Sequence, residues 1–128
     1  MRYKPEFFTW AEFDSPDAPG SGTSMQDEFV MLLDQLRGAC RFPFKLTSAY
    51  RTASHNASVG GAPGSAHLLG QAADIACTGV QAFQILRHAP VLFTGIGVKI
   101  KNGSGFVHVD NMAPGGNVTR PLVWTYPF

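Results

Sequence analysis

Hydrophobic side chains recur every three or four positions in residues 24–38, and this spacing predicts an amphipathic helix. Its apolar stripe consists of Met25, Phe29, Leu32, Leu33 and Leu36. Thr23 and Gln26 form a candidate capping box at the start of the helix, and Gly38 is a candidate stop signal at its end. We expect this helix to be core scaffold, preceded by an irregular segment over residues 1–22.

A second helix is predicted over residues 79–89. Val80, Phe83 and Leu86 share one face of it and are expected to point inward. The helix is expected to stop before Pro90, because the residue that precedes a proline is disfavoured in the helical conformation.

Five segments show the alternation or the short apolar runs that are typical of β-strands. They cover residues 44–50, 71–77, 93–101, 105–110 and 122–126. Asn102-Gly103 is a strong hairpin signal, since both positions tolerate positive φ. Residues 52–70 are rich in small and polar side chains, and we expect a long loop there. This mixture of elements predicts a single α+β domain over residues 1–128, with a small, mainly antiparallel sheet flanked by helices.

The charge balance limits the classes of partner. Ten Lys and Arg against nine Asp and Glu leave a net charge of +1, which argues against nucleic-acid binding and against a polybasic membrane anchor. No apolar run approaches the roughly 18 residues that a membrane span needs, and the N-terminus lacks the apolar stretch of a signal peptide. Without a signal for export, Cys40 and Cys77 are expected to be free buried thiols.

Two of the four histidines stand in unusual surroundings. His88 lies within the second predicted helix and is interpreted as a surface residue, and His55 as a residue of the long loop. His67 instead lies between that loop and a strand of small residues, in the middle of which stands the carboxylate of Asp74. Strand alternation places His108 and Asp110 on one face of another strand.

Two imidazoles and one carboxylate suit a catalytic Zn²⁺ ion, because they leave the fourth tetrahedral position for water. A buried carboxylate such as Asp74 also has other possible partners. It could pair with Arg51 or with a backbone amide, while His67 and His108 pack in the core. The spacing of the three residues leaves both readings open.

Several motifs together resemble the zinc D-Ala-D-Ala carboxypeptidase family of peptidoglycan peptidases, whose fold is shared with the Hedgehog signalling domain and with some phage endolysins. The run Ser65-x-His67-x-x-Gly70-x-Ala72-x-Asp74 is similar to the first zinc motif of that family. The segment Phe106-Val107-His108-Val109-Asp110 is similar to its second zinc motif, and Ser48-Ala49-Tyr50-Arg51 to its Ser-x-Tyr-Arg element. The resemblance extends over roughly residues 8–126, with the motifs in the order of the family.

The resemblance implies that His67, Asp74 and His108 bind one Zn²⁺ ion, which activates a water molecule and polarises the scissile carbonyl. It implies that Arg51 lies near the substrate, where a guanidinium suits a carboxylate or an oxyanion; a salt bridge to Asp74 or Asp110 is its structural alternative. Ser65 either binds substrate or shapes its loop.

One departure from the family concerns the general base. Many members have a Glu three residues before the last zinc histidine, where this chain has Gly105, and others have a His two residues before it, where this chain has Phe106. Asp110 is the nearest ionisable candidate for the catalytic base. It could equally orient His108 or Arg51.

The resemblance implies a zinc peptidase, acting as a carboxypeptidase or an endopeptidase on peptidoglycan stem peptides, and we expect a monomer. The alternatives are a zinc-containing cell-wall-binding module without catalysis and a metal-free structural protein. The lack of a signal peptide predicts a protein that stays in the cytoplasm until it is released, as in phage lysis, or a module of a larger exported protein.

Overall fold

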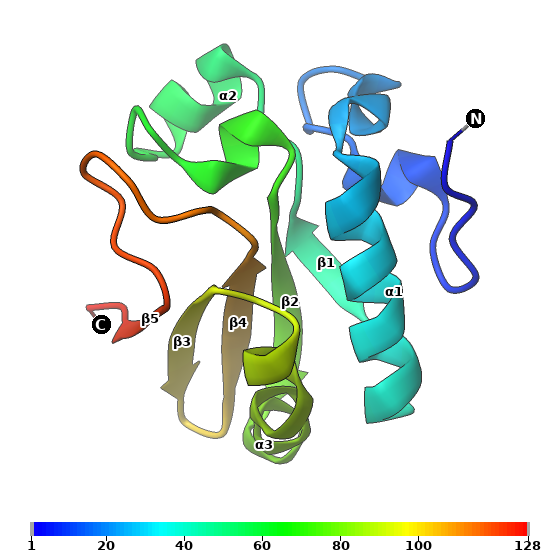
Figure 1. Ribbon diagram of the computed structural model, residues 1–128, viewed down its shortest axis with the longest axis vertical. Helices are drawn as coiled ribbons and strands as arrows, with labels where there is room; N and C mark the ends of the chain where they lie inside the picture. Colours follow the sequence, from blue (N-terminus) through cyan, green and yellow to red (C-terminus); the bar gives the residue numbers. More distant parts are fainter. Residues whose placement is uncertain (1, 128) are drawn as a thin grey trace.

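An open five-stranded sheet forms the centre of the molecule in the computed structural model, which describes residues 2–127 (Figure 1). The strand order is β1-β2-β4-β3-β5. The strands are β1 (Lys45–Ser48), β2 (Ala72–Thr78), β3 (Gly95–Lys101), β4 (Ser104–Asp110) and β5 (Leu122–Thr125). Three of the four pairings are antiparallel, and β5 runs parallel to β3. The predicted α+β class and mainly antiparallel sheet are confirmed.

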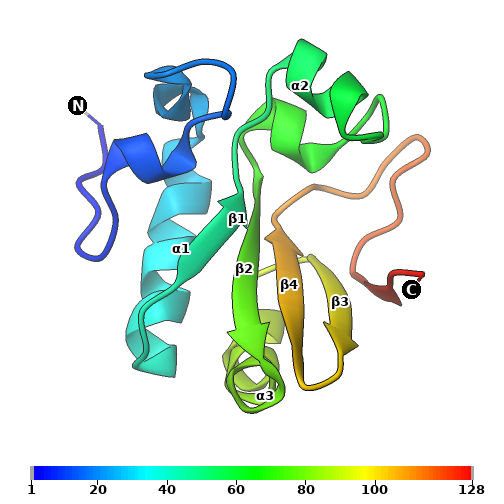
Figure 2. The same cartoon turned by 180° about the vertical axis from the view of Figure 1, so that it is seen from behind.

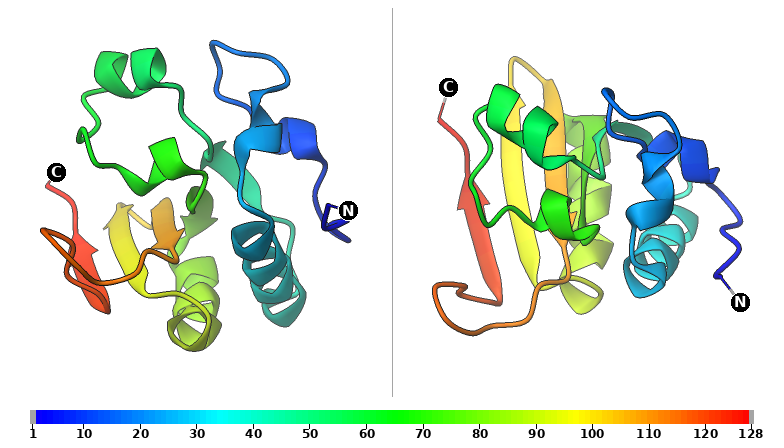
Figure 3. Two further views of the ribbon diagram at one scale, coloured as in Figure 1. Left: turned by 45° about the horizontal axis from the view of Figure 1, so that its top comes forward. Right: turned by 90° about the horizontal axis from the view of Figure 1, so that it is seen from above.

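Residues 2–127 also contain three α-helices: α1 (Asp27–Cys40), α2 (Ala53–Ser58) and α3 (Gly79–His88). Four short 3-10 helices, η1 to η4, cover Trp10–Phe13, Ser21–Ser24, Ala66–Leu69 and Ala89–Val91. Helices α1 and α3 lie side by side and contact each other (Figure 3). No helix in residues 2–127 is long and apolar enough to cross a membrane.

The two faces of the sheet have different roles. Ala73 and Ile75 of β2 and Val107 and Val109 of β4 are fully buried and belong to the same hydrophobic cluster as Phe29 of α1. Because successive side chains of a strand point to opposite faces, the intervening residues Asp74 and His108 lie on the other face. Helix α2 and the segment after β4 lie beyond the ends of the central strands on that side of the molecule (Figure 2).

The ends of α1 differ from the prediction. Its first residue is Asp27, and no side chain caps it, so the predicted box of Thr23 and Gln26 is absent. The backbone N–H of Gln26 donates instead to the carbonyl of Gly70, which ties the helix start to the site-bearing segment. The helix runs past Gly38 and ends at Cys40, and the next residue, Arg41, adopts a positive φ of 61°.

The inner face of α3 was predicted correctly for Leu86, which packs against the core, and wrongly for Val80 and Phe83. Val80 and Phe83 are 78% and 69% exposed, whereas Ala82 and Ile85 are buried. The helix contacts β2 and β4, and the small side chain of Ala82 allows it to lie close to the sheet. The predicted end before Pro90 is confirmed.

Residues 52–70 are not a continuous loop, because they contain α2 and η3. The side-chain oxygen of Thr52 accepts a hydrogen bond from the His55 N–H and caps α2. The buried Asn56 amide donates to the carbonyl of Ala62. These local polar contacts order the segment although it has no hydrophobic periodicity.

Two other predictions hold in the structure. Asn102 and Gly103 connect β3 to β4 with φ angles of 54° and 87°, as the hairpin signal requires. Cys40 and Cys77 are buried free thiols.

Candidate metal centre

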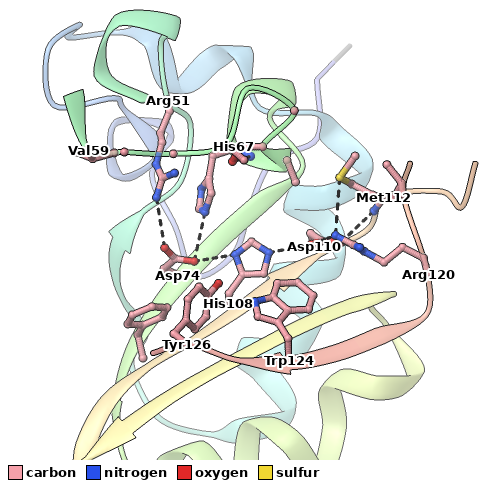
Figure 4. A pocket seen from close by; sticks show the side chains of 18 of the residues that line it. Arg51, Val59, His67, Asp74, His108, Asp110, Met112, Arg120, Trp124 and Tyr126 are labelled. Carbon is pink, nitrogen blue, oxygen red and sulfur yellow. Dashed lines mark hydrogen bonds and ion pairs between the residues drawn. The ribbon is translucent and has the colours of Figure 1, made fainter. Parts of the chain in front are cut away.

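One row of paired residues crosses four strands and carries most of the site. Asp74 of β2 is paired with His108 of β4, His108 with Gly97 of β3, and Gly97 with Trp124 of β5. A Cβ atom at Gly97 would lie 2.6 Å from the indole nitrogen of Trp124, so only glycine leaves room for that ring. The sheet therefore places Asp74, His108 and Trp124 next to one another on its open face (Figure 4).

His67 comes from η3 and approaches this row from outside the sheet (Figure 4). Its Nε2 atom is 3.3 Å from Asp74 Oδ1, and Nδ1 of His108 is 2.9 Å from the same oxygen. The ligand atoms of the three residues all lie within 4.8 Å of one another, and the three residues are at most 8% exposed. The structure thus brings together the three predicted metal ligands.

The second nitrogen of each imidazole has a fixed partner. His67 Nδ1 is 2.7 Å from the carbonyl oxygen of Ala49, and His108 Nε2 is 2.8 Å from Asp110 Oδ2. Both partners are acceptors, so these nitrogens donate and carry the protons. Metal-binding histidines are typically held in this way by a carbonyl or a carboxylate, which leaves the other nitrogen for the ion. The donor set therefore fits a zinc-type ion.

The electrostatics of Asp74 agree with a cation at this point. Burial disfavours the charged forms, but hydrogen bonds from His108 and His67 hold the pKa of Asp74 well below its usual range. Burial likewise lowers the pKa of His108, but hydrogen bonds to Asp110 and Asp74 outweigh it and raise that pKa, so a metal ion at Nδ1 would displace a proton. A carboxylate that stays ionised in a buried position is suited to a cation.

Asp110 lies on the side of the His108 ring that faces away from Asp74 (Figure 4). Its carboxylate is fully buried and accepts two hydrogen bonds from Arg120, at 2.9 Å from Nε and 2.8 Å from Nη2. Burial opposes ionisation, but the hydrogen bonds from His108 and Arg120 lower the pKa of Asp110 to about 2. Asp110 therefore remains ionised, and both of its oxygens accept hydrogen bonds.

Arg51 follows β1 and is anchored on two sides. Its Nε donates to the hydroxyl of Ser48 at 3.1 Å, and Nη1 donates to Asn56 Oδ1 at 3.2 Å. Its remaining nitrogen, Nη2, is 3.8 Å from Asp74 Oδ2, a loose ion pair. The Ser65 hydroxyl accepts a hydrogen bond from the His67 N–H at 3.3 Å, and both Ser65 and Arg51 line the pocket.

The pocket above the three candidate ligands has a volume of about 540 Å³, which is in the range of small-molecule sites. Residues 59–66 form one wall, and residues from the segment between β4 and β5 form another. Phe106, Trp124 and Tyr126 line a third, aromatic side, with ring centroids 5.1 Å apart for Phe106 and Tyr126.

Arg120, Trp124 and Tyr126 were not predicted as site residues. They come from β5 and its flanks, and parallel pairing with β3 brings them to the site from far along the chain. The local sign of this was Gly97 on β3, which leaves the space that the side chains of Trp124 and Tyr126 fill.

The strand geometry also shows how Gly105 and Phe106 lie, the two residues at the positions where a general base was expected. Gly105 lies three residues before His108 and therefore on the opposite face of β4, where a Cβ atom would collide with the carbonyl of Lys99. Phe106 lies on the same face as His108, and its ring lines the pocket. The remaining histidines, His55 and His88, are partly exposed and do not line the pocket.

A comparison with protein families identifies a relationship. The sequence profile described as Peptidase M15 matches residues 8–110. This range includes Arg51, Ser65, the three candidate ligands and Asp110, whereas Arg120 and the whole of β5 lie beyond it. None of the curated proteins matches the chain.

Proposed function

This chain belongs to the Peptidase M15 family of D-Ala-D-Ala carboxypeptidase-like peptidoglycan peptidases, and we propose that it is a zinc-dependent peptidase that hydrolyses peptide bonds of peptidoglycan stem peptides. The observation that carries this proposal is the convergence of His67 Nε2, His108 Nδ1 and Asp74 on one point. The pocket directly above that point is large enough for a short peptide.

In this proposal, His67, Asp74 and His108 hold one Zn²⁺ ion. When bound, the ion supplies Lewis acidity toward the scissile carbonyl and activates the attacking water. The hydrogen bonds to Ala49 and Asp110 keep the protons on the outer nitrogens of both imidazoles, so that the inner nitrogens stay available.

Arg51 binds the peptide substrate through its Nη2 group. Ser48 and Asn56 fix the other two nitrogens of the guanidinium, so Nη2 can donate into the pocket without a change of rotamer. A preorganised donor of this kind stabilises a carboxylate or a developing oxyanion at little reorganisation cost. Ser65, at the start of η3, is placed to contact the peptide from the wall of the pocket.

Tyr126 is a second donor for the reacting carbonyl. Its hydroxyl points toward Asp74 and His108 (Figure 4). Burial raises the pKa of Tyr126, so the phenol remains protonated at neutral pH and able to donate. Asp110, the candidate general base in the sequence, is better suited to orient His108, because Arg120 and His108 occupy both of its oxygens.

The test is to incubate the zinc-loaded protein with linear and cross-linked muropeptides, with and without a chelator, and to measure product masses. Loss of one alanine that the chelator abolishes identifies a carboxypeptidase, and splitting of the stem or cross-link identifies an endopeptidase. His67→Ala is the matched inactive control. No mass change with zinc bound would contradict the proposed hydrolysis.

A second candidate is a zinc-containing module that binds cell-wall peptides without cleaving them. It is favoured by the lining of the pocket, in which the only carboxylates among the described residues are Asp74 and Asp110, both engaged. Retention of muropeptides by the zinc-loaded protein, with no product in the same incubation, would support this candidate.

A further inference from the structure

We infer that Arg120 is a positioning residue of the metal centre, which acts through Asp110 to fix the orientation of the His108 imidazole. The inference rests on the proposed metal site. Arg120 lies in the segment between β4 and β5, outside the range that matches the family profile.

The contacts of Arg120 show that its side chain is held in place. Nε and Nη2 donate to the two oxygens of Asp110, and Nη1 donates to the carbonyl of Thr119 at 2.8 Å. The guanidinium also lies 5.2 Å from the centroid of the Trp124 ring. Arg120 lines the pocket, but only 12% of its side chain is exposed, and all three guanidinium nitrogens already donate to these acceptors.

Asp110 transmits this constraint to His108. Oδ2 of Asp110 accepts hydrogen bonds from Nη2 of Arg120 and from Nε2 of His108, each at 2.8 Å. The carboxylate already lies against Gly95 of β3, in the space that a Cβ atom would occupy at that position. It therefore has no room to move closer to β3. Arg120 and Gly95 together therefore restrict the position at which Asp110 accepts the hydrogen bond from His108.

The fixed carboxylate in turn decides which His108 nitrogen faces the metal. A donor at Nε2 directed at Asp110 leaves Nδ1 beside Asp74, and Trp124 packs against the same imidazole with ring centroids 5.2 Å apart. A buried carboxylate also needs a cationic partner, and Arg120 is the only arginine or lysine within salt-bridge distance of Asp110 among residues 2–127. Without Arg120, Asp110 keeps only the hydrogen bond from the Met112 N–H, at 3.3 Å from Oδ1, besides that from His108, so the acceptor that orients His108 is held less firmly.

The experiment compares zinc affinity, measured by chelator competition, in the wild type, Arg120→Gln and Arg120→Lys. Partners of metal-binding histidines typically contribute about 10- to 100-fold in metal affinity, so we expect a loss of that size in Arg120→Gln and partial recovery in Arg120→Lys. Arg87→Gln, at an exposed position in the last turn of α3, is the control and is expected to bind zinc like the wild type.

Two further measurements separate positioning from a merely structural role. The absorption spectrum of the Co²⁺-substituted protein is expected to change in Arg120→Gln. Asp110→Asn is expected to lose affinity similarly, and the double variant to lose little more, because both residues act through one contact.

Unchanged zinc affinity and an unchanged cobalt spectrum in Arg120→Gln, with only a lower melting temperature, would overturn the inference. Arg120 would then only stabilise the segment between β4 and β5. Unchanged affinity with a raised KM would overturn it in favour of substrate binding. A wild-type protein that binds no zinc would instead refute the proposed metal site, and the inference with it.

Discussion

Gly95→Ala tests whether the space beside Asp110 is as tight as the structure indicates. A Cβ atom at position 95 would lie 2.5 Å from Cγ of Asp110 and closer still to both carboxylate oxygens. Non-bonded heavy atoms do not approach so closely, so either Asp110 or the backbone of β3 must move. Asp110 is fully buried and bonded to Arg120 and His108, so its movement breaks those contacts.

The expected cost follows from the size of the collision. Overpacking of a well-packed interior typically destabilises by about 1–3 kcal/mol. For a chain of this length, 1 kcal/mol corresponds to a change of about 4 °C in melting temperature, so Gly95→Ala should melt about 4–12 °C below the wild type. Thermal unfolding of the metal-free protein, followed by circular dichroism, measures this shift. Zinc affinity is expected to fall in the same variant.

Gly79→Ala is the matched control. The nearest atom to a Cβ at position 79, the first residue of α3, is the carbonyl oxygen of Gly103 at 3.9 Å. Alanine fits there and restricts the unfolded chain, so we expect stabilisation by about 0.5 kcal/mol, or about 2 °C. A Gly95→Ala protein with wild-type melting temperature and zinc affinity would refute the reasoning.

Two predictions concern groups away from the site. The hydrogen bond to Asp34, together with burial, raises the pKa of Tyr3 to about 12, so the stabilisation by its protonated form is complete below pH 10 and is lost as the pH rises from about 10 to 12. The melting temperature of Tyr3→Phe should therefore fall less than that of the wild type between pH 9 and 11.5, and parallel declines would contradict this. Burial raises the pKa of Cys40 to about 11 and that of Cys77 above its ordinary value, so iodoacetamide at pH 7.5 should label neither thiol in the native protein and both in denaturant. Rapid labelling of the native protein would show that the thiols are accessible.

The local signals in the sequence predicted the strands and the hairpin well. Alternating side chains and the Asn102-Gly103 pair are properties of a few adjacent residues, and they located β3 and β4 to within two residues of their observed ends. The same alternation placed His108 and Asp110 on one face, as observed. The ligand set followed from motifs that contain all three residues.

The errors arose where tertiary packing or polar contacts decide the structure. Hydrophobicity favoured Val80 and Phe83 as the inner face of α3, but close approach to the sheet selects the smaller Ala82. Helix α2 depends on Thr52 and Asn56, which carry no periodic signal.

Arg120 shows the same limit for the site. Its partner Asp110 is ten residues away, and the contact depends on the path of the intervening segment. The pairing of β5 with β3 is parallel and distant in sequence, so the spacing of residues did not indicate that Trp124 would reach His108.

The most direct test of the account is the zinc content of the protein. Metal analysis after dialysis against a limited excess of zinc should give one ion per chain in the wild type. His67→Ala, Asp74→Ala and His108→Ala should each retain much less, while circular dichroism shows that they remain folded. A wild-type protein without zinc, or three variants that bind it as well as the wild type, would contradict a metal centre formed by these residues.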